Sequence, residues 1–306
     1  EDMTPCIACL QGCVANMYAG NPICCLTNPF LGHEAEPIAK TENPKKVMVI
    51  GGGVAGLCAA FIAKEKGHEV TLYEAGDVLG GNMRLAAYPP GKGDITNMIR
   101  SYIHRCQKDG VKIVMNCEVT PELIKEEKPD SVIIATGSKT LILPIEGIDN
   151  PAIIHGSDLL DGKRPAGKKV LVVGGGMVGC ETAAFLGEQE HDVTVIEFRD
   201  TVGADVIHEH RVYLMKDFED YGIKEITGAK VCKFYEDGVE YETADGVRHE
   251  TRGYDSVILS MGFRNYNPLE EKIKDLVPET HVIGDAIRAR RALDATKEAY
   301  EVASRL

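Results

Sequence analysis

The sequence lacks the features of a membrane or secreted protein. No apolar run approaches the ~18 residues that a membrane-spanning helix needs. The N-terminus has no basic region followed by an apolar core, so we expect no signal peptide. We therefore expect a reducing, cytoplasmic location, in which the ten cysteines serve metals or catalysis rather than disulfides. The chain begins at Glu1 rather than Met, and we expect it to be a piece of a longer polypeptide.

Positive charge is also scarce. The 34 Lys and Arg residues face 47 Asp and Glu residues, which gives a net charge of −13. This balance argues against nucleic acid or an anionic membrane surface as the main partner. With 306 residues the chain is long enough to bury a full core and suggests about two domains.

The strongest pattern is a dinucleotide-binding unit at residues 46–75. A run of β-branched and apolar residues predicts a buried parallel strand, and a glycine turn, an apolar-periodic helix and a second strand follow it. In such a turn the first glycine permits a tight bend, the second lets a pyrophosphate approach, and the third lets helix and strand pack closely. These glycines are Gly51, Gly53 and Gly56. Glu74 ends the second strand and is placed to accept hydrogen bonds from a ribose.

The same unit recurs later in the chain. Gly174, Gly176 and Gly179 repeat the turn, and Glu197 repeats the terminal acid at the same spacing. Two copies predict an α/β fold with two Rossmann-like domains that bind two dinucleotides. Glu197 favours the free ribose 2′-hydroxyl of NAD(H), whereas Arg199 is able to meet the 2′-phosphate of NADP(H).

Two further turns indicate which copy holds which cofactor. The strand at 129–138 ends in Ala135, Thr136 and Gly137, a turn typical of the point where a flavin domain receives an inserted domain. Near the end of the chain, a short strand runs into Gly284 and Asp285 before another helix. An aspartate in this place typically holds the ribityl or pyrophosphate part of FAD, and the helix N-terminus faces the flavin. Because the chain's end completes the first copy, we assign FAD to the first copy and NAD(H) to the second.

These assignments divide the chain into an N-terminal segment and linker at 1–43, an FAD-binding domain at 44–148 and 254–306, and an inserted NAD(H)-binding domain at 149–253.

The loop at 76–95 carries Gly81 and Asn82, which suggests backbone close to the flavin. It contains no cysteine, so the redox pair of glutathione reductase-type enzymes is missing. Glu181 is a candidate neighbour of the nicotinamide, although a carboxylate at a helix start is also stabilised by the helix dipole.

Five cysteines lie in the first 25 residues: Cys6, Cys9, Cys13, Cys24 and Cys25. The spacing C-x2-C-x3-C turns three thiolates toward one centre, and a fourth follows after ten or eleven residues. Four thiolates suit a [4Fe–4S] cluster. A structural zinc is the alternative, although the second C-x2-C knuckle of a zinc ribbon is missing. The spacing alone leaves open which of the last two cysteines is the fourth ligand.

The order of these features resembles the C-terminal half of the 2,4-dienoyl-CoA reductase and enoate reductase family, which includes trimethylamine dehydrogenase. The opening EDMTPCIACLQGC with CLTNP resembles the segment where that family's FMN-bearing TIM barrel ends and its cluster begins. The resemblance implies cluster ligation by Cys6, Cys9, Cys13 and Cys25. It also implies FAD contacts at Ala55, Glu74, Asn82, Lys92 and Val119. The barrel, its FMN and the acid–base residues for C=C reduction are absent from this sequence.

The resemblance implies the electron-transfer half of an NADH-dependent oxidoreductase. NADH would pass hydride to FAD, and single electrons would continue through the cluster to FMN in a barrel of the same polypeptide or of a separate subunit. It also allows a homo-oligomer formed through the full-length enzyme. Two other interpretations stay open. One is a stand-alone NADH:acceptor flavoprotein that feeds a partner protein, like the small subunit of glutamate synthase. The other is a non-enzymatic nucleotide-binding module with a structural zinc.

Overall fold

The computed structural model describes residues 3–306, and the chain divides into two compact units. The first unit contains the residues up to 87 together with 94–139 and 264–306. The second unit contains 88–93 and 140–263. The expected domain boundaries after 148 and 253 thus differ from the unit boundaries, and the N-terminal segment belongs to the first unit. Which cofactor each unit holds stays a prediction.

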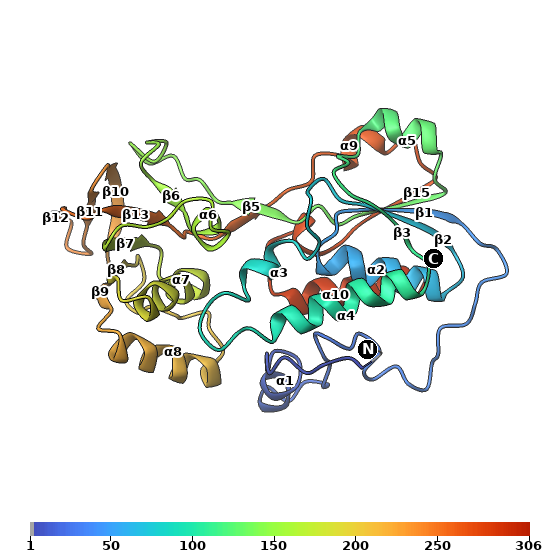
Figure 1. The fold of residues 1–306 in the computed structure, drawn as a ribbon, viewed down its shortest axis with the longest axis horizontal. Helices are drawn as coiled ribbons and strands as arrows, with labels where there is room; N and C mark the ends of the chain where they lie inside the picture. Colours follow the sequence, from blue (N-terminus) through green and yellow to red (C-terminus); the bar gives the residue numbers. More distant parts are fainter. Residues whose placement is uncertain (1–2) are drawn as a thin grey trace. The chain divides into compact units, whose positions relative to one another are not determined.

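A five-stranded parallel sheet forms the centre of the first unit (Figure 1). In spatial order its strands are β15 (Glu279–Val282), β4 (Ser131–Ile134), β1 (Lys46–Ile50), β2 (Glu69–Tyr73) and β3 (Lys112–Val114). One face carries the long helices α2 (Val54–Glu65), α4 (Ile95–Lys108) and α10 (Ala292–Ala303). The other face carries α5 (Pro121–Glu127) and α9 (Glu270–Ile273). The short α1 (Val14–Tyr18), α3 (Asn82–Leu85) and the 3-10 turn η1 (Gly284–Ala286) lie outside these layers.

Strand β1 explains why the sequence shows a continuous apolar run here. Val47 and Val49 pack into the core under α2, whereas Met48 and Ile50 pack into the core on the opposite face. Because successive side chains of a strand point to opposite faces, a strand covered by helices on both sides is apolar at every position. The predicted parallel α/β fold class is confirmed by this sheet and by the sheet of the second unit.

The second unit repeats this architecture. In spatial order its parallel strands are β6 (Ile154–His155), β13 (Ser256–Leu259), β7 (Lys169–Val173), β8 (Asp192–Ile196) and β9 (Lys224–Ile226). The helices are α6 (Gly156–Leu160), α7 (Met177–Glu188) and α8 (His208–Asp220). A two-stranded sheet of β5 (Ser138–Thr140) and β14 (Phe263–Asn265) lies where the chain passes between the two units.

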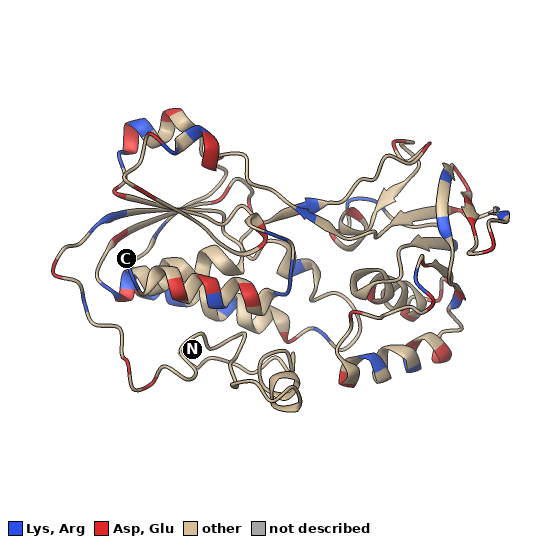
Figure 2. Ribbon diagram, turned by 180° about the vertical axis from the view of Figure 1, so that it is seen from behind, with Lys and Arg blue, Asp and Glu red and all other residues tan. Residues whose placement is uncertain are grey.

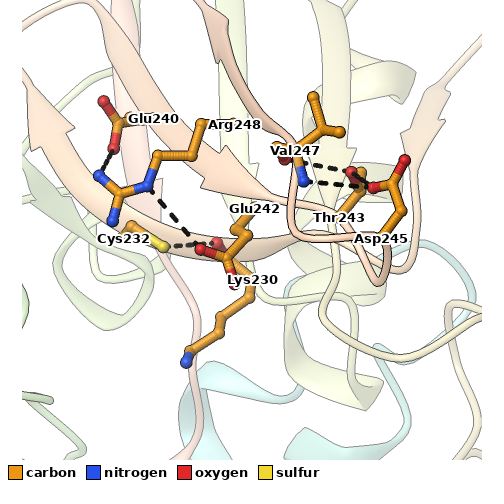
Figure 3. A network of polar contacts seen from close by, with 8 residues as sticks. All are labelled: Lys230, Cys232, Glu240, Glu242, Thr243, Asp245, Val247 and Arg248. Atoms are coloured by element: carbon orange, nitrogen blue, oxygen red, sulfur yellow. Dashed lines mark hydrogen bonds and ion pairs between the residues drawn. The ribbon is translucent and has the colours of Figure 1, made fainter.

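An antiparallel sheet completes the second unit. It consists of β10 (Lys230–Tyr235), β11 (Gly238–Glu242) and β12 (Arg248–Thr251), and residues 236–237 form the hairpin turn between the first two strands. Phe234 and Val239 pack against the parallel sheet. On the solvent side, Arg248 pairs with Glu240 at 2.8 Å (Figure 3). Such an exposed pair contributes little stability, so the buried face holds this sheet in place.

Charged side chains are spread over both units (Figure 2). Lys and Arg residues occur on many elements, and α8 and α10 each carry residues of both signs. Among the described residues, no helix is long and apolar enough to cross a membrane.

Candidate nucleotide-binding turns and cysteine segment

The first glycine turn has the backbone that a dinucleotide requires. Gly51 has φ of 109°, and a Cβ on it would lie 2.3 Å from the Ala135 carbonyl oxygen, so no other residue fits. A Cβ on Gly56 would lie 1.9 Å from the Gly51 oxygen, which shows how closely α2 approaches β1. Gly53, the N-cap of α2, has no atom within 4 Å of such a Cβ. The space beside Gly53 and the unpaired N–H groups of the helix N-terminus suit a phosphate.

The acid at the end of β2 is already bound to backbone. Glu74 accepts a hydrogen bond from the Gly52 N–H at 2.7 Å through Oε2 and one from the Gly76 N–H at 2.7 Å through Oε1. A carboxylate has about four lone-pair sites, so both oxygens keep room for a ribose hydroxyl. The two backbone bonds fix the orientation in which Glu74 would meet that ribose.

The turn from the chain's end joins the same unit. Gly284 has φ of 63°, and a Cβ on it would lie 3.1 Å from the Cβ of Ala55. Asp285 accepts hydrogen bonds from the Ser138 hydroxyl at 2.9 Å and from the Arg290 N–H at 3.0 Å. Asn82 in turn donates to the Ser138 Oγ at 3.4 Å. The structure therefore brings Asn82 and Asp285 together through Ser138, a residue that sequence analysis did not identify.

Four further FAD candidates, Gly81, Thr136, Gly137 and Val119, belong to the first unit. Gly81 has φ of 54°, and a Cβ on it would lie 3.1 Å from the Gly53 Cα. Thr136 donates to the Tyr266 carbonyl at 2.5 Å, and Gly137 has φ of 74°. Val119 is buried in the core between the sheet and α5. Their contact with FAD stays a prediction.

The second glycine turn has nearly the same geometry. Gly174 has φ of 106°, and a Cβ on it would lie 2.4 Å from the Ser260 oxygen. A Cβ on Gly179 would lie 1.8 Å from the Gly174 oxygen. Glu197 accepts from the Gly175 N–H at 2.5 Å and from the Arg199 N–H at 2.9 Å. The backbone N–H of Arg199 thus helps to hold the Glu197 carboxylate in place. The Arg199 side chain was expected to act against Glu197 in cofactor selection, because it is able to meet the 2′-phosphate of NADP(H).

A carboxylate lies at the start of α7, where a phosphate would be expected. Asp205 accepts a hydrogen bond from the Met177 N–H at 2.9 Å. Both of its carboxylate oxygens lie 3.4–3.5 Å from the position of a Cβ on Gly176. The helix N-terminus attracts negative charge, and Asp205 supplies it in this structure. No local sequence pattern predicts this contact, because Asp205 reaches the turn from the loop after β8.

Glu181 and Lys92 form an ion pair inside the second unit. Glu181 is 8% exposed on α7. A buried carboxylate needs a charged partner, which Lys92 provides. The structure brings together a residue expected at FAD and a residue expected at the nicotinamide, although their contact with either cofactor stays a prediction.

The cysteine segment, residues 6–25, packs on the first unit. Ile7 and the adjoining Leu26 are buried in the same core as α2, α4 and α10. Ala8 and Leu10 have positive φ of 50° and 54°, which is uncommon outside glycine and bends the chain sharply between the cysteines. The Ala8 N–H donates to the Cys6 Sγ at 3.4 Å.

The Cys9 thiol is partly buried and lies near three other thiols of the segment. Burial raises the pKa of the Cys9 thiol, although a hydrogen bond to the backbone of Gln11 lowers it. The nearby thiols of Cys25, Cys13 and Cys6 raise this pKa further. These are the four residues that the family resemblance implies as ligands.

Cys24 has a different environment. Its Sγ accepts a hydrogen bond from the Asn16 side chain at 3.4 Å, and it lies 2.9 Å from the position of a Cβ on Gly12. Within residues 3–306, however, no group of three or more His, Cys, Asp or Glu residues is close enough to hold one metal ion. In a [4Fe–4S] cluster each thiolate binds a different iron, so the sulfurs stay farther apart than the ligands of a single ion.

Comparisons with known proteins agree with this fold. Residues 45–283 match the family model for pyridine nucleotide-disulphide oxidoreductases. The chain belongs to this oxidoreductase family. Membership supports FAD and NAD(H) as its cofactors. Unlike the disulphide enzymes for which the family is named, this member has no cysteine at residues 75–95.

The relatives of this oxidoreductase are longer proteins. It is 32% identical to the cinnamate reductase of Clostridium sporogenes, over 100% of this chain and 46% of that protein. It is 33% identical to the NADH oxidase of Thermoanaerobacter brockii, over 99% of this chain and 48% of the relative. The structure of a 2-naphthoyl-CoA reductase complex matches with a TM-score of 0.94 at 32% identity, over 100% of this chain and 47% of that one. The chain thus spans about half the length of these relatives, and the predicted resemblance to enoate reductase-type enzymes is confirmed.

Proposed function

We propose that this chain is the electron-transfer module of an NADH-dependent, ene-reductase-type oxidoreductase. The observation that carries the proposal is the pair of nearly identical glycine turns, of which only the first receives Gly284 and Asp285 from the end of the chain. We therefore assign FAD to the first unit and NADH to the second. With its cofactors bound, the module would transfer hydride from NADH to FAD and pass single electrons on to an iron–sulfur cluster.

The cysteine segment is our candidate site for that cluster. The thiols of Cys25, Cys13 and Cys6 raise the pKa of the Cys9 thiol, and the Ala8 N–H donates to the Cys6 sulfur. Hydrogen bonds to sulfur stabilise thiolate ligands and tune the cluster potential. The Cys25 thiol is among those that raise the pKa of the Cys9 thiol, which supports Cys25 as the fourth ligand.

The partner that we propose is an FMN-bearing TIM barrel, in the same polypeptide or in a separate subunit. The support is that the chain matches only about half of each relative, while those relatives are named as reductases and oxidases. The described cysteines are all free thiols, which fits a reducing compartment, and we propose the cytoplasm.

The test is anaerobic purification followed by iron analysis, a visible spectrum and an assay of NADH oxidation with ferricyanide. We expect flavin bands, a broad iron–sulfur shoulder and about four irons per chain. Cys25→Ser should lose the iron, and the neighbouring Cys24→Ser is the matched control that should largely keep it. A colourless protein that holds one zinc would refute the electron-transfer function, and the opposite behaviour of the two variants would refute only the ligand assignment.

A further inference from the structure

One buried tyrosine connects the cysteine segment to the helices of the first unit. Tyr102 lies on α4 and is 2% exposed. Its hydroxyl donates a hydrogen bond to the backbone carbonyl of Leu26 at 3.0 Å. Leu26 is fully buried and directly follows Cys25 in the chain. The bond therefore holds the peptide next to the proposed fourth ligand.

The surroundings fix the tyrosine ring and keep its hydroxyl protonated. The Phe61 ring of α2 packs edge-on against Tyr102 with centroids 5.1 Å apart. Burial raises the pKa of Tyr102 well above its usual range, and the nearby Cys58 and Cys25 thiols raise it further. A protonated hydroxyl in a fixed ring is a dependable donor to the Leu26 carbonyl.

The Tyr102 hydroxyl also connects to residues of α2 and α10. The Cys58 thiol of α2 lies against the Tyr102 hydroxyl and itself donates to the Thr296 carbonyl of α10 at 3.8 Å. Polar contacts thus run from the residue after Cys25 through α4 and α2 to α10. A tyrosine that only filled space would not need its hydroxyl at this point, since phenylalanine has nearly the same volume.

We propose that Tyr102 is a positioning residue for the cluster, and that its hydroxyl holds the Cys25 loop in the geometry that binds iron. This inference rests on the proposed function, because it requires Cys25 to be a ligand. Without the hydroxyl, the Leu26 carbonyl would remain buried with no partner, which is costly, and the loop would move to satisfy it.

The experiment compares Tyr102→Phe with Tyr73→Phe in the complete chain, purified anaerobically. Tyr73 is the matched control, because it is a buried tyrosine of the same unit, on β2, with its hydroxyl beside Glu127 rather than the cysteine segment. We expect Tyr102→Phe to lose iron to a chelator about tenfold faster than the wild type, with unchanged FAD content. We also expect the midpoint potential and EPR spectrum of its cluster to change, since these depend on hydrogen bonding and solvent exposure around the sulfurs. Tyr73→Phe should match the wild type in each measurement.

Cys58→Ala distinguishes the two contacts of the Tyr102 hydroxyl, one with the Leu26 carbonyl and one with the Cys58 thiol. It removes the thiol and leaves the Tyr102–Leu26 bond, so its cluster should behave as in the wild type. If the wild type holds four irons and Tyr102→Phe matches Tyr73→Phe in iron loss and potential, the inference is wrong and the proposed function stands. Parallel loss of FAD and iron in Tyr102→Phe would also overturn it, because the residue would then serve the packing of the whole unit. A wild type without an iron–sulfur cluster would refute the proposed function and this inference together.

Discussion

The two nucleotide-binding units use one turn geometry but differ in what occupies it. Their first glycines have φ of 109° and 106°, and their terminal acids, Glu74 and Glu197, each accept the N–H of the second residue of the turn. In the second unit Asp205 accepts the Met177 N–H at the start of α7, whereas at the start of α2 no atom lies within 4 Å of a Cβ on Gly53. The glycine motif thus determines the backbone geometry of a phosphate turn. Residues elsewhere in the chain, such as Asp205, determine whether a side chain occupies the place where the phosphate would bind.

The largest expected effect comes from adding a Cβ to one of the two glycine turns at a time. Gly53→Ala should yield folded protein without FAD, because its Cβ meets no protein atom and would block only the pyrophosphate. A loss of about 3 kcal/mol would weaken binding by ~100-fold. Gly176→Ala should leave the protein yellow but impair its reduction by NADH.

Flavin absorbance per chain and anaerobic bleaching by NADH measure both effects. Gly93→Ala, at a glycine with equally open surroundings and no positive φ, is the control and should change neither. Loss of FAD in Gly176→Ala together with retention in Gly53→Ala would reverse the assignment of cofactors to units.

The second prediction concerns the turn that only the first unit receives. Asp285→Ala should weaken FAD retention by ~1–3 kcal/mol, because one partly buried charged acceptor is lost. Ser138→Ala should have a smaller effect of about 1 kcal/mol, since it removes one of the two donors that orient the carboxylate. Flavin release during dialysis or dilution measures both, and NADH binding to the holoprotein should remain unchanged. An Asp285→Ala protein with the FAD affinity of the wild type would show that this turn does not distinguish the units.

The third prediction tests the cofactor preference of the second unit. Glu197→Ala should narrow the advantage of NADH over NADPH in dye reduction, because the carboxylate that repels a 2′-phosphate is removed. A change of ~1 kcal/mol in selectivity is expected, the size of one hydrogen bond. Glu197→Gln is the sharper variant, since its amide oxygen keeps an acceptor for the Gly175 N–H. A wild type that prefers NADPH would mean that the Arg199 side chain sets the selection.

The smallest expected effect concerns Asp205. Asp205→Asn should tighten NADH binding about two- to fivefold, because Asn still caps α7 but no longer places a negative charge where the pyrophosphate would lie. Raising the salt concentration should reduce the difference between the two proteins, since salt screens the repulsion. Titration of NADH at low and high salt measures this, with FAD content as the control. Weaker NADH binding by Asp205→Asn would indicate that this carboxylate assists the cofactor.

Much of the fold follows from local sequence. The amphipathic pattern of residues 95–108 predicts a helix, which is α4, and both strand–turn–helix units lie where their glycines predict them. The residues at 111–119 predict a strand that is longer than the one the structure has. Strand β3 ends at Val114, because Asn116 adopts a positive φ of 53° and its N–H bonds to Gly76 instead of a neighbouring strand.

The residues that sequence analysis missed act through distant contacts. Ser138 meets Asp285, Asp205 meets the α7 N-terminus, and Tyr102 meets Leu26, each across a separation that no periodic pattern encodes. Motifs with fixed internal spacing are therefore predictable, whereas the side chains that orient them depend on tertiary packing.

Because β5 pairs with β14, the segment of the chain between these two strands could in principle be removed. The chain leaves the first unit after residue 139 and returns at 264, and these two points lie on neighbouring hydrogen-bonded strands. A short hairpin turn is enough to join neighbouring antiparallel strands. If the first unit holds FAD as proposed, deletion of 140–263 with such a turn would leave the FAD-binding unit together with residues 88–93, and the deleted segment could be exchanged between related proteins.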